Sequence, residues 1–184
     1  MDVKKAIESR RAYRSLEPAK FTREIVDDLA SCARIAPSCN NNQPARFVFV
    51  TDPAQLEKVF GSLNKGNEWV QKASMVIGVF SMPEFDCLIK ERQYYLFDTG
   101  IAVGFIVLRA TELGYVAHPI AGYNEDTAKE AMGIPPEARL ITLINCGIHS
   151  ETVDPILSDN QKLAEKQRPP RKEPSETIFY DKYR

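Results

Sequence analysis

The chain has few residues of the kinds that build metal centres or disulfide scaffolds. Its 184 residues include two histidines and four cysteines, and no two cysteines have CxxC spacing. A zinc site would need ligands from distant parts of the chain, so we expect no metal. No apolar stretch of the secretory type follows Met1. We therefore expect a cytoplasmic protein without disulfides.

Long apolar runs, nucleotide-binding fingerprints and excess charge are absent as well. The longest apolar run, Ile101–Leu108, is far shorter than the roughly 20 residues of a membrane span. The net charge of -1 argues against a nucleic-acid-binding surface. No GxGxxG, P-loop or Gly-x-Ser-x-Gly motif occurs, which excludes a Rossmann site, a P-loop and an α/β-hydrolase nucleophile. We expect neither a membrane nor a nucleic acid as partner.

Helical and strand patterns alternate along the chain without a regular repeat. This arrangement favours a single α+β domain over residues 1–184, built around one sheet. The predicted helices are Val3–Ser9, a helix from Thr22 to Pro37, a helix after Asp52, Glu91–Leu113 and Asn124–Gly133. The predicted strands are Arg46–Val50, Met75–Phe80, Tyr115–His118 and Leu140–Cys146, with a turn over 119–123.

The loop over residues 36–44, here called the amide loop, carries four consecutive side-chain amides from Asn40 to Gln43. A connection between core elements has no packing reason for such a run. Amides offer both donors and acceptors, which suits a planar heterocycle with alternating C=O and N–H groups, such as the pyrimidine end of a flavin. Taken alone, the segment is more typical of a polar surface loop.

Three arginines, Arg10, Arg11 and Arg14, follow the first predicted helix. If the helix continued through them, spacings of three and four residues would place them on one face. Guanidinium groups bind phosphate through paired hydrogen bonds. A solvated basic face is the alternative interpretation.

Together the two segments resemble the FMN-dependent nitroreductase family. That family opens with an Arg-Arg-Ser-x-Arg-like motif, followed by Ala-Pro-Ser-x-x-Asn-x-Gln-Pro, and the counterparts here are residues 10–14 and 36–44. The resemblance extends from about Val3 to the C-terminal tail. It implies a nitroreductase-like fold with a central mixed sheet flanked by helices, an FMN cofactor and a homodimer.

The resemblance also assigns FMN-binding positions. Arg10 and Arg11 would hold the phosphate and ribityl end, and Arg14 would lie near flavin N1 and O2. Ala12 stands where serine is common in the family, so a backbone contact must serve there. The amide-loop positions, which the family contributes from the opposite subunit, are Pro37, Ser38, Cys39 and Asn41, with Gln43 as a further motif position.

Further positions follow from the same resemblance. Asn67 resembles an asparagine near the flavin pyrimidine, and Arg168 and Arg171 are candidates for the phosphate. The segment Pro119, Ile120, Ala121, Gly122 resembles the family's Pro-Ile-Glu-Gly turn, whose backbone N–H groups face flavin N5 and O4. Alanine replaces the glutamate at position 121. This change keeps the backbone N–H donor. We expect it to affect which electron-accepting substrate enters the pocket.

The implied activity is hydride transfer from NAD(P)H through flavin N5 to a small electrophilic acceptor, such as a nitroaromatic or a quinone. The sequence shows no acid/base constellation, which suits chemistry carried out by a cofactor. Two alternatives remain open. One is a specialised enzyme on the same scaffold, for flavin breakdown, dehalogenation or enoate reduction. The other is a flavin-binding carrier or sensor without turnover.

Residues 151–184 lack the pattern of a separate domain but end in the apolar segment 178–180. In the family such a tail wraps onto the partner and adds an edge strand to its sheet. Gly100 and Gly104 would allow a second helix to approach closely. Cys32 and Cys146 are expected in the core, and Cys39 is expected to fill space beside the cofactor, with a redox role as the alternative.

Overall fold

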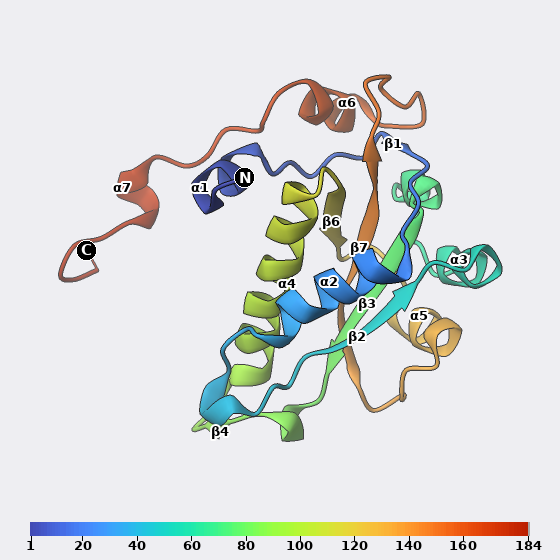
Figure 1. Ribbon diagram of the computed structural model, residues 1–184. Helices are drawn as coiled ribbons and strands as arrows, with labels where there is room; N and C mark the ends of the chain where they lie inside the picture. The colour runs from blue at the N-terminus through green and yellow to red at the C-terminus, as the bar shows by residue number, and fades with distance from the viewer. Residues whose placement is uncertain (184) are drawn as a thin grey trace.

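The computed structural model, which describes residues 1–183, is built around one antiparallel sheet (Figure 1). β7 (Arg139–His149) is the long central strand. It pairs on one side with β3 (Met75–Ser81), which pairs in turn with the edge strand β2 (Arg46–Val50). It also pairs with β6 (Val116–Ile120) and, near its C-terminal end, with the short β1 (Leu16–Glu17). The predicted α+β fold is confirmed. A mixed sheet was expected, but all strand pairs of the sheet within residues 1–183 are antiparallel.

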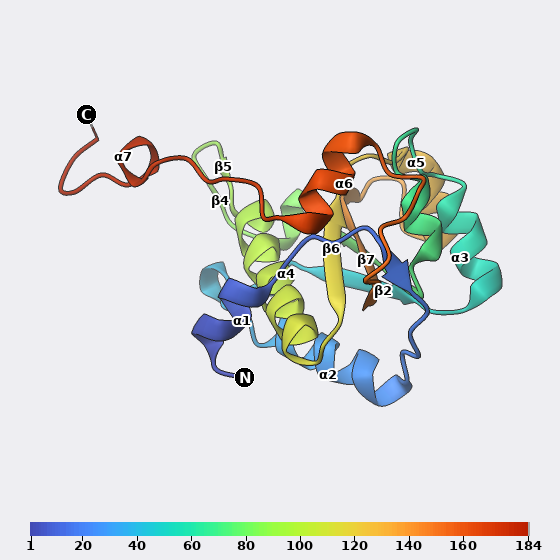
Figure 2. The ribbon, with the colours of Figure 1, turned by 90° about the horizontal axis from the view of Figure 1, so that it is seen from above.

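Helices cover both faces of the sheet (Figures 1 and 2). α2 (Arg23–Arg34) and α4 (Tyr94–Glu112) pack against Met75, Ile77 and Val79 of β3. α3 (Pro53–Phe60) and α5 (Glu125–Met132) pack on the opposite face, against Val76. Successive side chains of a strand point to opposite faces, so β3 is buried on both sides, as its continuous apolar run predicts.

Most predicted helix boundaries are confirmed. The side chain of Asp52 accepts a hydrogen bond from Gln55 N at the start of α3. Asn124 caps α5 in the same way, and Gly133 ends that helix with a φ of 66°. Asp2 caps α1 (Val3–Ser9). Thr22 occupies the N-cap position of α2 without a side-chain cap bond.

Two local predictions are wrong. Residues 10–15 are not helical, because α1 ends at Ser9 and the chain then runs towards β1, where Leu16 pairs with His149. Arg10 and Arg14 therefore do not share a helix face. The predicted turn over 119–123 also starts too early, because Pro119 and Ile120 belong to β6.

The C-terminal region has two parts. Up to α6 (Asp159–Lys166) it packs on its own chain, where Leu157 and Glu165 are buried. Beyond α6 the chain extends away from the body through α7 (Pro174–Thr177), as Figures 1 and 2 show. The extended tail thus begins near residue 167 and not at 151.

Shorter elements complete the description. They are η1 (Cys39–Asn41), η2 (Glu68–Lys72), η3 (Pro83–Phe85) and the small hairpin of β4 (Leu88–Ile89) with β5 (Arg92–Gln93). Within residues 1–183 no helix combines the length and the apolar character that crossing a bilayer requires.

Candidate functional site

Four arginines from two distant segments gather at one end of the molecule: Arg10, Arg11, Arg168 and Arg171. Arg168 Nη2 donates to the carbonyl oxygens of Glu8 and Arg10 at 2.6 and 2.7 Å. Arg11 Nη2 donates to the Ala164 carbonyl at 2.7 Å. Among the described residues none of the four forms a salt bridge with a carboxylate.

The positive charges of this arginine cluster act on one another. Partial burial lowers the pKa of Arg10, and the nearby charges of Arg168, Arg171 and Arg11 lower it further. Like charges that converge without a protein counter-charge are stabilised by a bound anion. The tail segment after α6 therefore adds two guanidinium groups to the positive charge that begins at Arg10.

Glu165 of α6 holds the backbone of the arginine segment. Its two carboxylate oxygens accept the N–H groups of Arg14 and Ser15 at 2.8 and 3.0 Å. Its side chain is only 2% exposed and lies 3.8 Å from His149 Nε2. This carboxylate fixes the non-helical backbone of Arg14 and Ser15, because it satisfies N–H groups that a helix would otherwise use.

Arg14 lies over the indole of Trp69, with 5.7 Å between its Cζ and the ring centroid. Burial lowers the pKa of Arg14, and the negative charge of Glu165 opposes that shift. Trp69 Nε1 donates to Asn67 Oδ1 at 3.3 Å, and Asn67 Nδ2 donates to the Gly122 carbonyl at 2.9 Å. The structure thus links Arg14, Asn67 and Gly122 through one series of contacts.

Gly122 has a steric requirement, because a Cβ at this position would overlap the Asn67 side-chain amide. Its neighbours Pro119 and Ala121 are exposed, whereas Ile120 is buried in the core below them. The segment therefore presents backbone and small side chains at the surface and is anchored by one apolar residue. Ala12 is half-buried.

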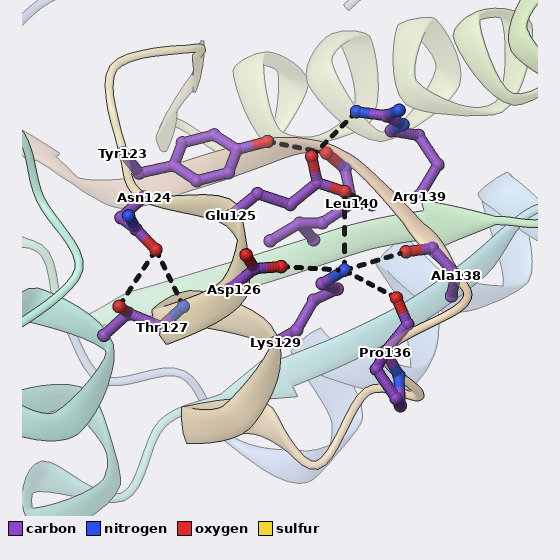
Figure 3. Close-up of polar contacts among 10 residues, drawn as sticks. All are labelled: Tyr123, Asn124, Glu125, Asp126, Thr127, Lys129, Pro136, Ala138, Arg139 and Leu140. Carbon is purple, nitrogen blue, oxygen red and sulfur yellow. Dashed lines mark hydrogen bonds and ion pairs between the residues drawn. The ribbon is translucent and has the colours of Figure 1, made fainter.

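A polar network fixes the C-terminal end of the segment over residues 119–122 (Figure 3). Tyr123 Oη donates to the Leu140 carbonyl at 2.9 Å, and burial raises the pKa of Tyr123 to about 12. The buried Lys129 Nζ donates to the Pro136 carbonyl at 2.8 Å and lies 3.2 Å from an Asp126 carboxylate oxygen. These bonds fasten α5 to the start of β7 and so hold the turn that precedes α5.

The amide loop lies beside the N-terminal part of α4. Asp98 of α4 accepts the Cys39 N–H at 2.6 Å, and Ser38 Oγ accepts the Gln43 N–H at 2.8 Å. Asn41 and Gln43 are exposed. Pro37, Ser38 and Gln43 also line a cavity of about 530 Å³ between α2, β2 and α4.

The two predicted halves of the flavin site lie at opposite ends of α4 (Figure 1). The amide loop is near β4, at the end of α4 where the helix begins, whereas the arginine segment lies towards its last turn. A helix of 19 residues is about 28 Å long. Within one chain the structure therefore does not bring the two halves together.

The expectation of no disulfide is wrong, because Cys39 is bonded to Cys87. The pair is 48 residues apart in sequence, and the segment before β4 folds back against the amide loop. Sequence spacing alone could not identify this contact. Cys146 lies in the core as expected, whereas Cys32 is only half-buried.

Two residues that shape the site belong to no sequence motif. Glu165 carries no motif, and only its position against residues 14 and 15 shows its role. His118 is buried, contacts the Tyr13 carbonyl through Nδ1 at 3.0 Å and lies 4.9 Å from the Trp69 ring. Trp69 belongs to no motif, and its nearness to Asn67 in sequence is the available signal.

We expect His118 to make the protein sensitive to acid. Burial lowers the pKa of His118 from 6.5 to about 4 in the folded chain. The positive charges of Arg14 and Arg10 lower this pKa further, whereas the Tyr13 carbonyl and the negative charge of Glu165 oppose the shift. Between these values only the unfolded chain binds the proton. The free energy of unfolding should therefore fall by about 3 kcal/mol as pH drops from 6.5 to 4.

Denaturant unfolding of wild type and His118→Gln across this pH range measures the effect. The variant should lose most of the acid slope, and His149→Gln, which leaves His118 in place, should retain it. An equal slope in wild type and His118→Gln would show that other groups cause the acid sensitivity.

We expect Glu165→Ala to lower the free energy of unfolding by about 2–4 kcal/mol, because two N–H groups in a buried position lose their acceptor. Glu165→Gln keeps one acceptor oxygen and should lose less. The exposed Glu151→Ala is the matched control. Chemical denaturation of the three variants gives the comparison, and a Glu165→Ala protein as stable as the control would contradict the role given to Glu165.

An antiparallel α+β fold with these segments defines the class as nitroreductase-like. The family model described as "Nitroreductase family" matches residues 7–148. The chain belongs to the nitroreductase family.

Individual relatives are consistent with this membership. The chain is 27% identical over 172 residues to the "Putative NAD(P)H nitroreductase YdgI" of Bacillus subtilis, covering 74% of this chain and 82% of that protein. A crystal structure of a nitroreductase family protein from Clostridium novyi NT superposes with a TM-score of 0.76 at 30% identity, covering 82% and 87% of the two chains. A structure described as an oxidoreductase containing FMN superposes at 0.79 with 26% identity, covering 96% and 89%.

Proposed function

We propose that this chain is an FMN-dependent oxidoreductase that takes hydride from NAD(P)H and reduces a small electrophilic acceptor, such as a nitroaromatic or a quinone. The observation that carries the proposal is the arginine cluster. Burial and the neighbouring positive charges lower the pKa of Arg10, and the four guanidinium groups are not paired with carboxylates within residues 1–183. Membership of the nitroreductase family and the FMN-containing structural neighbour support it.

The residues present fit FMN. The arginine cluster offers guanidinium donors to a phosphate, and Arg14, Asn67 and the segment up to Gly122 form the adjoining surface. A second copy would supply Ser38, Cys39, Asn41 and Gln43 of the amide loop. When bound, FMN would supply the hydride-transfer chemistry between the nicotinamide and the acceptor.

Arg14 provides the electrostatic part of the proposed activity. Its guanidinium is held over Trp69, and its backbone N–H is bound by Glu165. A cation held in place before reaction stabilises negative charge that develops on the pyrimidine side of a flavin without a reorganisation cost. His118 is buried and keeps a pKa of about 4, so it is not poised as a proton donor at neutral pH.

The proposal includes a homodimer in which each site is built from both chains. The two halves of the site lie at opposite ends of α4 in one chain, so a second copy is needed to complete each. α4 exposes Leu96, Phe97 and Phe105. Apart from the backbone of α4 itself, a Cβ at Gly100 or Gly104 would meet no described atom within 4 Å, which leaves room for a second helix.

The direct test is the absorbance spectrum of purified protein, followed by FMN titration and anaerobic addition of NADH or NADPH. We expect flavin absorption that bleaches on addition of the nicotinamide. Arg10→Ala should weaken FMN binding, whereas Arg23→Ala, which removes an exposed arginine paired with Asp27, should not. A protein that neither carries nor takes up FMN would contradict the proposal.

Replacement of the family's glutamate by the exposed Ala121 favours one alternative, a flavin-binding carrier or sensor. The segment keeps its glycine and its backbone support, so we expect the change to alter acceptor choice instead of abolishing turnover. Bound FMN that NADH and NADPH both fail to reduce would favour the carrier or sensor.

A further inference from the structure

The Cys39–Cys87 bond joins the amide loop to the segment that leads into α4. Cys39 begins η1, and Cys87 directly precedes β4. Their Cα atoms are 6.1 Å apart, within the usual range for a disulfide. The bond is a second redox-active group in a chain whose proposed chemistry uses a flavin.

Other contacts of the amide loop converge on the same segment. Asn42 Nδ2 donates to Asp86 Oδ1 at 3.2 Å, and the Cys39 N–H donates to Asp98 at 2.6 Å. The Nδ2 groups of Asn42 and Asn40 approach Cys87 Sγ at 3.4 and 3.5 Å. The disulfide is therefore the covalent member of a clamp between the loop and residues 86–98.

The loop needs such support because of its backbone. Asn40, Asn41 and Gln43 have φ values of 49°, 56° and 52°. Residues other than glycine adopt positive φ at a cost, and they keep it only where the surroundings impose it. Three such residues within four positions make this loop sensitive to the loss of a tether.

We propose that Cys39–Cys87 is a reversible thiol–disulfide site whose state sets how tightly the protein holds its flavin. This inference rests on the proposed function, because it takes the amide loop as part of the flavin site. In the oxidised protein the loop is already ordered. In the reduced protein it must be ordered on binding, which lowers affinity.

The reacting partner is a dithiol. A thiolate of the dithiol attacks one sulfur, which forms a mixed disulfide while the S–S bond breaks and the other sulfur leaves as thiolate. Both cysteines are half-buried and so accessible to a small dithiol. Cys87 is the favoured leaving sulfur, because the Asn40 and Asn42 amides can donate to its thiolate.

The second thiol of the dithiol then attacks the mixed disulfide and releases Cys39. In total the dithiol loses two electrons and two protons and becomes a disulfide. Cys39 and Cys87 gain the same two electrons and two protons and become thiols.

The experiment uses the full-length protein in oxidised form and after treatment with dithiothreitol, which is removed before measurement. Intact mass and thiol titration report the state of the pair. FMN titration and hydrogen exchange of residues 38–43 report its effect. We expect two thiols before reduction and four after it, faster exchange in the loop, and roughly tenfold weaker FMN binding.

Cys87→Ser should match the reduced protein and should not respond to dithiothreitol. Cys32→Ser changes a half-buried cysteine outside the pair and should respond as wild type does. Because the bond closes a long loop, its loss should also lower the Tm by roughly 5–10 °C.

Three results would overturn the inference. One is four free thiols after treatment with an oxidant, and a second is equal loop exchange in the two states. The third is one zinc ion held by the reduced chain through Asp86 and both cysteines, whose ligand atoms lie within 4.8 Å of one another, since the reduced loop would then stay fixed. Absence of FMN binding in both states would contradict the proposed function instead, and loop exchange would still decide whether the clamp exists.

Discussion

Ending the chain after Gln167 is expected to give a monomer that no longer retains FMN. The removed residues include Arg168 and Arg171 of the arginine cluster and the exposed apolar end of the tail, where Ile178 and Tyr180 are 54% and 84% exposed. Loss of two guanidinium contacts to a phosphate should weaken FMN binding roughly 100-fold or more. Light scattering and flavin absorbance of the truncated protein measure both effects.

The position of the cut matters. A cut after Pro155 would also remove Leu157 and Glu165, which are buried against the chain's own body, and would test stability instead of assembly. Two full-length variants separate the roles of the tail. Phe179→Ala/Tyr180→Ala should impair dimerisation first, and Arg168→Ala/Arg171→Ala should impair FMN binding first. A truncated protein that stays dimeric and yellow would show that the tail is an accessory.

Arg14→Ala is expected to slow flavin reduction by NAD(P)H roughly 100-fold and to weaken FMN binding less than about tenfold. The cation over Trp69 acts mainly once negative charge appears beside it, and loss of one such contact typically costs a few kcal/mol of charge stabilisation. Stopped-flow reduction beside an FMN titration gives the two numbers.

Arg14→Lys is the matched control for this prediction. It keeps a positive charge and should recover part of the rate, although lysine lacks the planar group that lies on the indole. Equal losses in rate and affinity for Arg14→Ala would make Arg14 a simple binding residue.

Local sequence patterns determined most of the elements of this fold. The caps at Asp52 and Asn124 and the glycine at 133 set helix ends through backbone hydrogen bonds and positive φ, which are local effects. The continuous apolar run over Met75–Phe80 predicted a strand buried on both faces, because only burial between two layers tolerates it. The motif order at residues 10–14 and 36–44 pointed to the family to which the chain belongs.

Tertiary structure decided what depends on contacts between distant residues. The backbone of Arg14 and Ser15 is held by the buried carboxylate of Glu165, which lies 150 residues further along the chain from Ser15. Cys39 meets Cys87 because the segment before α4 folds against the amide loop. The separation of the two predicted half-sites along α4 is likewise a property of the folded chain, since no local pattern records the distance between segments joined only through the core.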